Sequence, residues 1–157
     1  MSIHLDYSNI FEFTQVPIEY LFVDSADIEP GVSGIAVSNL SMQDWFFRFH
    51  FPNDPIMPGT LMMEAVMELG TLVIGTLPEK AKKRIMVRGC KNMTITGQAR
   101  PGDQLKITTE TQKYRRGVAA FSGQIENKGA IILKMQYELM VPDEMTPMPC
   151  GGGLNKS

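Results

Sequence analysis

The stretch RFHFPNDPIMPG, residues 48 to 59, combines a residue suited to acid–base chemistry with an unusually rigid backbone. It contains one imidazole, His50, together with three prolines and a closing glycine. Proline fixes its own φ angle and restricts the residue before it, so this loop should hold His50 in one place. An imidazole changes charge near neutral pH and serves as a general acid or base. His50 is therefore the first candidate catalytic residue.

A helix is predicted immediately after this loop. Pro58-Gly59 is a typical helix start, and Pro78 marks its end. Apolar residues cover almost the whole circumference of the segment between them, which is typical of a buried helix. Four other residues form one stripe, because they are spaced by four, three and four positions: Glu64, Glu68, Thr71 and Gly75. A stripe with two carboxyls faces a cavity, a partner subunit or water.

Glu64 supplies an acid that could work with His50. Burying an unpaired carboxylate costs several kcal/mol, so the group pairs, keeps a proton or opens onto a polar pocket. A protonated carboxyl near an imidazole can help to remove a proton from one carbon and give one to a leaving oxygen. The Gly59 N–H at the helix N-terminus can polarise a carbonyl. Together these groups indicate elimination next to a thioester carbonyl.

Other interpretations remain open on these residues alone. A lone histidine in an aromatic loop is more often structural than catalytic. Glu64 could pair with Arg84 or Arg88. His50, Asp54 and Glu64 lack the compact spacing of a strong metal site, so we expect no metal.

Composition limits the class of protein. A chain of 157 residues, 43% hydrophobic and 20% charged, suits one globular domain, and its formal net charge of −2 gives no general attraction for nucleic acid. No apolar segment is long and uninterrupted enough for a confident membrane span, and no secretory signal is visible. The two cysteines form no motif, so we expect a reducing, cytoplasmic setting.

Extended segments flank the predicted helix on both sides. Turn signals such as Pro30-Gly31, Pro101-Gly102 and Asn127-Lys128-Gly129 separate alternating or apolar runs. These runs predict five or six strands, near residues 20–28, 33–40, 84–96, 104–114, 118–127 and 130–141. Such a sheet must wrap around the single helix to bury it, which predicts an α+β fold. We expect one domain over residues 1–141 and a disordered tail over 142–157.

The segment HFPNDPIMPGTLMMEAVMELG resembles the active-site signature of the FabA/FabZ-type β-hydroxyacyl-acyl-carrier-protein dehydratases. That signature is His-Phe-Pro, two variable residues, Pro-x-Met-Pro-Gly and then Glu or Asp. The fourteen-residue gap from His50 to Glu64 matches the family's gap. PIEYLFVDSADIEPG, ARPGDQLKI and YRRGVAAFSGQI resemble other family segments, so the likeness covers roughly residues 15–141. The motif also resembles dehydratase domains of polyunsaturated fatty acid and polyketide synthases.

The resemblance implies a hot-dog fold, in which an antiparallel β-sheet is wrapped around one long central α-helix. It also implies a homodimer or higher oligomer whose active sites are shared between subunits. His50 would take the C2 proton of a (3R)-3-hydroxyacyl thioester, Glu64 of the other subunit would assist departure of the hydroxyl, and Gly59 would hold the thioester carbonyl. This is the chemistry of a hydro-lyase of fatty acid or polyketide-type biosynthesis, and it needs no cofactor.

The expected partner is an acyl carrier protein or another acyl thioester. Acyl carrier proteins are acidic, so a basic patch should recruit them. Of the two basic segments, residues 80–84 and 113–116, the resemblance favours Arg115 and Arg116 for carrier docking. We expect residues around the motif to line the substrate tunnel: Phe49, Ile56, Met57, Thr60 and Met63.

Two positions depart from the family pattern. Phe49 stands where the family commonly has glycine or alanine, which should reshape the pocket entrance. Glu68 stands where the family usually has glutamine, and two carboxyls one helical turn apart should share protons, so Glu68 is expected to tune the site. Two alternatives stay open. One is a dehydratase that also isomerises the double bond, which Asp54-Pro55 favours and Glu64 disfavours, and the other is a non-catalytic acyl-binding hot-dog subunit, which only Glu68 favours.

Overall fold

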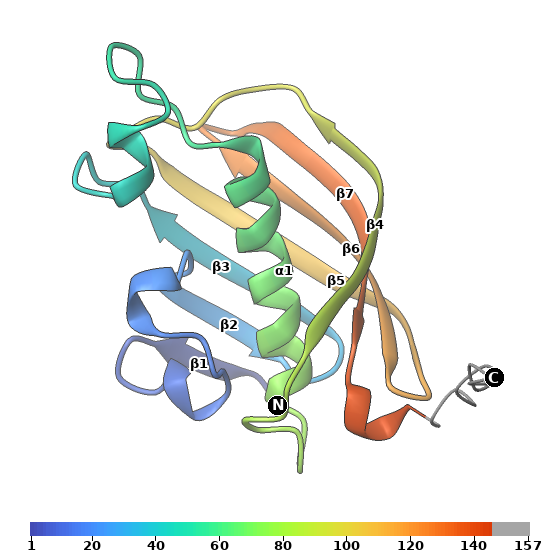
Figure 1. The fold of residues 1–157 in the computed structure, drawn as a ribbon. Coiled ribbons are helices and arrows are strands. Elements are labelled where there is room, and N and C mark those ends of the chain that lie inside the picture. The colour runs from blue at the N-terminus through green and yellow to red at the C-terminus, as the bar shows by residue number, and fades with distance from the viewer. Residues whose placement is uncertain (146–157) are drawn as a thin grey trace, which may run out of the picture.

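One long helix lies across one face of a curved antiparallel sheet (Figure 1). The structure, a computed structural model, describes residues 1–145, so most of the predicted tail, residues 146–157, lies outside the described residues. The helix, α1, spans Gly59–Gly75, close to the segment that the two prolines delimited. The expected α+β arrangement, a sheet wrapped around one central helix, is confirmed.

The sheet has seven strands in the order β1-β2-β3-β5-β6-β7-β4. Their bounds are β1 Ile3–Asp6, β2 Ser25–Glu29, β3 Ser33–Asn39, β4 Met86–Ile95, β5 Gln104–Arg115, β6 Val118–Asn127 and β7 Ala130–Met140. Every neighbouring pair is antiparallel, and β4 pairs with β7 alone, so β4 forms one edge. Short 3-10 helices lie in the connections: Ile10–Glu12, Ile18–Tyr20, Trp45–Arg48 and Pro142–Glu144.

The structure corrects the prediction at the N-terminal side of the sheet. Residues 20–24 were expected to begin a strand, but β2 begins only at Ser25, after the 3-10 helix Ile18–Tyr20. Local sequence does not predict β1, a four-residue strand that pairs with β2 and forms the other edge of the sheet. Leu5 of β1 is fully buried, so packing against the rest of the protein, and not local sequence, accounts for the formation of this strand.

The centre of α1 is packed tightly against the sheet, as its apolar circumference predicted. An added Cβ on Gly123 of β6 would lie 2.3 Å from the Val66 side chain, and one on Gly70 would lie 2.3 Å from the Tyr137 hydroxyl. Only glycine permits such a close approach of helix and sheet. The Tyr137 hydroxyl donates to the Val66 carbonyl at 3.1 Å, so this buried polar group is satisfied.

The N-terminal segment covers part of the polar stripe of α1. At the C-terminal end of the helix, a Cβ on Gly75 would lie 2.5 Å from the Phe13 carbonyl oxygen, so the chain passes directly over this position. Nearer the N-terminus of the helix, Glu68 is buried and accepts a hydrogen bond from the Phe22 backbone N–H at 3.0 Å. The stripe therefore does not face a single cavity, and Glu64 is the carboxyl that stays half exposed.

The start of the predicted tail is ordered. Pro142–Glu144 forms a short 3-10 helix, contrary to the expectation of disorder from residue 142. The Glu144 carboxylate accepts from the Tyr114 hydroxyl at 2.7 Å and pairs with Lys80 and Lys83, which ties this helix to β5 and to the loop after α1. Within residues 1–145, no helix is both long and apolar enough to span a membrane.

Candidate active site

The loop that carries His50 is closed by its own backbone. The Phe51 N–H donates to the Asp54 carbonyl and the Asp54 N–H donates to the Phe51 carbonyl, each at 3.1 Å. The Ile56 N–H then donates to the His50 carbonyl at 2.9 Å. These bonds form a compact loop between proline residues whose φ angles are already restricted. The loop fixes the position of His50, as its three prolines predicted.

A further hydrogen bond fixes the His50 ring. Its Nδ1 lies 3.1 Å from the Ile56 carbonyl oxygen. A carbonyl only accepts, so Nδ1 carries the hydrogen and Nε2 is the basic nitrogen of the neutral ring. The Phe51 ring stacks on the imidazole with a centroid distance of 4.0 Å. The ring is therefore held in the tautomer that a general base requires at Nε2.

His50 and Gly59 line the same cavity, which has a volume of about 390 Å³. Gly59 is the first residue of α1, where no side chain caps the helix, and the first N–H groups of a helix have no intrahelical partner. A Cβ at this position would lie 2.5 Å from the tip of Ile95 across the cavity. A side chain at Gly59 would therefore collide with Ile95, and the dipole of the helix that begins here favours negative charge at this end.

The other residues that line this cavity agree only in part with the residues expected to line the substrate tunnel. Ile56 and Met57 line the cavity, whereas Phe49, Thr60 and Met63 do not. Phe49 is 68% exposed, with the Arg48 guanidinium 5.4 Å from its ring centroid. The other lining residues are Met62 and residues 95–98. Sequence reasoning missed residues 95–98, because the register of a later strand brings them here and no local motif marks them.

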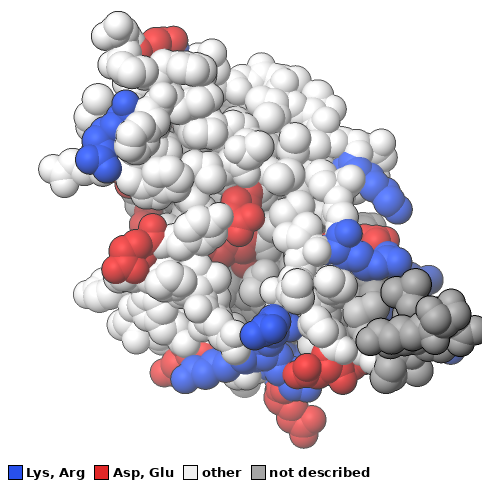
Figure 2. Space-filling model, viewed as in Figure 1, with Lys and Arg blue, Asp and Glu red and all other residues white. Residues whose placement is uncertain are grey.

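Glu64 does not line the cavity of its own chain. Neither Arg84 nor Arg88 pairs with it, since the described partner of Arg88 is Glu138. Burial raises the pKa of Glu64, so the protonated form persists to higher pH than in a free glutamate. Figure 2 shows acidic side chains at the centre of this face, over α1, among uncharged neighbours. Glu64 is thus a half-exposed carboxyl outside the cavity, with a pKa above that of a free glutamate.

Glu68 is 5% exposed and lies beneath the N-terminal segment. Burial raises its pKa to about 8, the Phe22 and Val23 N–H groups oppose this rise, and the charge of Glu64 adds a smaller increase. Its Oε1 has no hydrogen-bond partner within residues 1–145. Burial is thus the main cause of the raised pKa of Glu68, and the interaction with Glu64, on which the expected proton sharing depends, is secondary.

The two basic segments differ in their surroundings. Arg115 and Arg116 line a cavity of about 360 Å³ together with Lys113. They lie at the β5–β6 hairpin, at the opposite end of the sheet from the His50 loop (Figure 1). Lys80 and Lys83 of the other segment are paired with Glu144. The residues expected to dock a carrier are thus available, although they are distant from His50 of the same chain.

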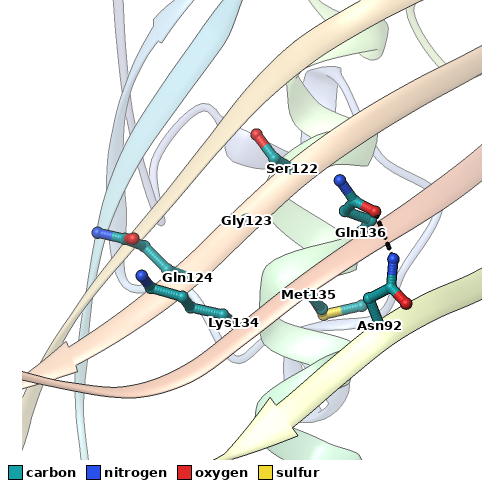
Figure 3. A pocket seen from close by; sticks show the side chains of 7 residues that line it. All are labelled: Asn92, Ser122, Gly123, Gln124, Lys134, Met135 and Gln136. Atoms are coloured by element: carbon teal, nitrogen blue, oxygen red, sulfur yellow. Dashed lines mark hydrogen bonds between the residues drawn. The ribbon is translucent and has the colours of Figure 1, made fainter.

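A separate polar cavity of about 370 Å³ lies on the face of the sheet turned away from α1 (Figure 3). Asn92 of β4 donates to Gln136 of β7 at 2.8 Å across it. No carboxyl or imidazole is among its lining residues, so it lacks the groups for acid–base catalysis. In the described part of the chain, no three His, Cys, Asp or Glu side chains are grouped so that they could hold a metal ion.

Comparison with known sequences places the chain in a family. The sequence profile of the FabA-like domain matches residues 25–136. A 3-hydroxyacyl-[acyl-carrier-protein] dehydratase FabZ from Chloroflexus aggregans is 34% identical over 122 residues, which cover 77% of this chain and 83% of the relative. The FabZ of Pelotomaculum thermopropionicum is 36% identical over 126 residues, covering 76% and 90%. The chain therefore belongs to the FabA-like family, with FabZ dehydratases as distant relatives.

Solved structures confirm the fold. The dehydratase heterocomplex ApeI:P from Xenorhabdus doucetiae has a TM-score of 0.71 at 12% identity and covers 85% of this chain and 90% of that one. Zebra fish thioesterase superfamily member 2 has a TM-score of 0.59 at 16% identity, covering 76% and 81%. At such identities the likeness concerns the fold alone, and that fold is the expected hot-dog arrangement.

Burial of Glu68 should make stability depend on pH. Its pKa rises from 4.5 to about 8 on folding. Between these two pH values the folded protein therefore keeps a proton that the unfolded chain releases. The free energy of unfolding should fall by a few kcal/mol between about pH 5 and pH 8 in the wild type and stay nearly level in Glu68→Gln. Urea unfolding at a series of pH values measures both slopes. Glu110→Gln, at an exposed position of β5, is the control, and an equal slope in Glu68→Gln would refute this role.

Proposed function

We propose that the protein dehydrates (3R)-3-hydroxyacyl thioesters, linked to an acyl carrier protein, to trans-2-enoyl thioesters. The observation that carries this proposal is the shared cavity of His50 and Gly59, in which one nitrogen is free to act as a base beside a helix N-terminus. The names of the curated FabZ relatives support the same substrate class. Synthesis of fatty acids or of polyketide-type chains is the process in which this step belongs.

The reaction assigns one task to each group. His50 Nε2 takes the proton from C2, and the electron pair of that bond forms the C2–C3 double bond. The Gly59 N–H stabilises the negative charge that develops on the thioester oxygen. Glu64 gives its proton to the C3 hydroxyl, which leaves as water. The raised pKa of Glu64 suits this last step, because a general acid must hold its proton at the working pH.

The complete site requires a second copy of the chain. Glu64 lies outside the cavity that contains His50 and Gly59 of its own chain. β4 is an edge strand in which nine of ten residues are exposed. Its exposed apolar residues are Met86, Val87, Met93 and Ile95. An unpaired apolar edge favours pairing with another strand, so we propose a homodimer joined through β4 with active sites shared between the subunits.

Carrier docking fits this arrangement. Arg115 and Arg116 lie far from His50 of their own chain, and β4 is antiparallel to β7 at the edge beside them. Two β4 strands that pair antiparallel about a two-fold axis bring the Arg115 end of one subunit toward the His50 end of the other. An acidic carrier bound to these arginines is then closer to its partner's cavity than to the one in the same chain.

The non-catalytic alternative is weakened by the position of Glu68. The carboxyl at this position was the one feature in favour of a subunit that only binds acyl chains. Glu68 anchors the Phe22 backbone and does not line the cavity of His50 and Gly59, and its interaction with Glu64 is secondary to its burial. We therefore retain the dehydratase as the proposed function.

His50→Ala and Glu64→Gln should each lower kcat far more than they raise KM, because both side chains act as the protons move. The expected loss is about 10²–10⁴-fold for each variant, the usual contribution of a general acid or base. The assay follows formation of the enoyl thioester by absorbance, with 3-hydroxyacyl substrates of graded length. Wild-type turnover by His50→Ala would show that the mechanism is wrong.

Shared active sites predict complementation between two inactive variants. An equal mixture of His50→Ala and Glu64→Gln chains, refolded together, should recover about a quarter of the wild-type activity, since half of the dimers are mixed and each has one intact site of two. Each variant refolded alone is the control. A mixture as inactive as its parents, with mixed dimers demonstrated by mass spectrometry, would place both residues in sites within one chain.

Charge reversal at the hairpin should affect carrier-linked substrates selectively. Arg115→Glu combined with Arg116→Glu should raise KM for an acyl carrier protein thioester about tenfold or more at low salt and leave a small thioester analogue unaffected. Arg84→Glu, in the other basic segment, is the matched control. Equal loss with both substrates would contradict docking and point to a role in folding.

A further inference from the structure

Gln98 lies at the rim of the cavity that contains His50 and Gly59. It follows β4, and its side chain is exposed, whereas Gly59 across the cavity is half buried. Two hydrogen bonds to backbone carbonyls hold this segment: the Asn127 side chain donates from Nδ2 to the Gln98 carbonyl at 3.2 Å, and the Met57 N–H donates to the Ala99 carbonyl at 2.8 Å. The rim is therefore joined to the His50 loop through Met57 and to β6 through Asn127.

The orientation of the Gln98 amide is set by Arg100. The Arg100 Nη2 donates to Gln98 Oε1 at 2.9 Å. A guanidinium has donors only, so the amide oxygen must face Arg100 and the amide nitrogen must face away from it. Within residues 1–145, no hydrogen-bond acceptor engages this nitrogen, so its two N–H groups are free to meet a ligand.

Arg100 is itself fixed by the loop that carries His50. Its Nη1 donates to Asp54 Oδ1 at 2.6 Å and lies 3.5 Å from the Pro55 carbonyl oxygen. Its backbone N–H donates to Asp103 Oδ2 at 2.9 Å. Asp54 and Arg100 are exposed, so their ion pair adds little to stability, but it links the His50 loop to the Gln98 amide. These contacts connect the Gln98 amide to the loop that carries His50.

We propose that Gln98 is a substrate-positioning residue whose amide N–H donates a hydrogen bond to an amide carbonyl in the thiol part of the acyl thioester. This inference rests on the proposed function, because the thiol arm of a carrier-linked thioester contains amide groups. The reacting thioester carbonyl belongs beside Gly59, further inside, whereas the arm must pass the exposed rim. Gln98 would thus help binding without taking part in proton transfer.

Binding of unreactive thioesters tests this inference directly. Saturated butanoyl thioesters lack the 3-hydroxyl and cannot be dehydrated, so calorimetry reports binding alone. One ligand carries N-acetylcysteamine, which has one amide, and the other carries pentanethiol, a chain of similar length without an amide. The wild type should bind the amide ligand about three- to tenfold more tightly than Gln98→Glu does, as expected for one hydrogen bond. The amide-free ligand should bind equally to both proteins.

Gln98→Glu is the most specific variant, because it keeps an oxygen acceptor for Arg100 and removes the two N–H donors. Gln98→Met should show the same selective loss, and Gln112→Glu, at an exposed site of β5, is the matched control. Equal binding of the amide ligand by wild type and both Gln98 variants would overturn the inference, and so would equal losses for both ligands. Dehydration of 3-hydroxybutanoyl thioesters is assayed separately, so failure of the proposed function would be recognised apart from failure of this contact.

Discussion

The hydrogen bond between His50 Nδ1 and the Ile56 carbonyl is the interaction on which the site depends. It determines which ring nitrogen is the base, and it exists only because the chain turns back on itself between the two residues. The restricted φ angles of the prolines and the bond from the Ile56 N–H to the His50 carbonyl hold that turn. The same rigid segment leads directly to Gly59, so one stretch of chain positions both the base and the donor for the thioester oxygen.

The rest of the fold supports this segment from two sides. The sheet packs so closely on α1 that Gly123 faces Val66 without room for a side chain, which fixes the helix and its N-terminus. On the other side, Glu68 binds the Phe22 N–H and holds the N-terminal segment over the stripe. Burying a carboxyl costs free energy and raises its pKa. Here the buried Glu68 holds the N-terminal segment against the helix, and Glu64 remains the half-exposed carboxyl of the stripe.

The helix, the His50 loop and the later strands could be predicted because their signals are local. Prolines, turn residues and apolar periodicity mark their ends, and the spacing of His50 and Glu64 reveals the family. Other features follow from long-range contacts. The burial of Glu68 depends on Phe22, which lies 46 residues earlier, and the approach of Gln98 to His50 depends on how β4 lies beside β7. No periodicity within α1 or β4 contains that information.

The ring tautomer of His50 tests the central claim most directly. Nitrogen-15 NMR of the histidine-labelled protein, recorded at a pH where imidazole is neutral, distinguishes a protonated ring nitrogen from a bare one. His50 is expected to carry its proton on Nδ1 and to have a bare Nε2. His4, whose exposed ring pairs with Asp27, is the second histidine whose signals must be assigned. A proton on Nε2 of His50 would contradict the proposed mechanism, because the nitrogen assigned to take the C2 proton would already be occupied.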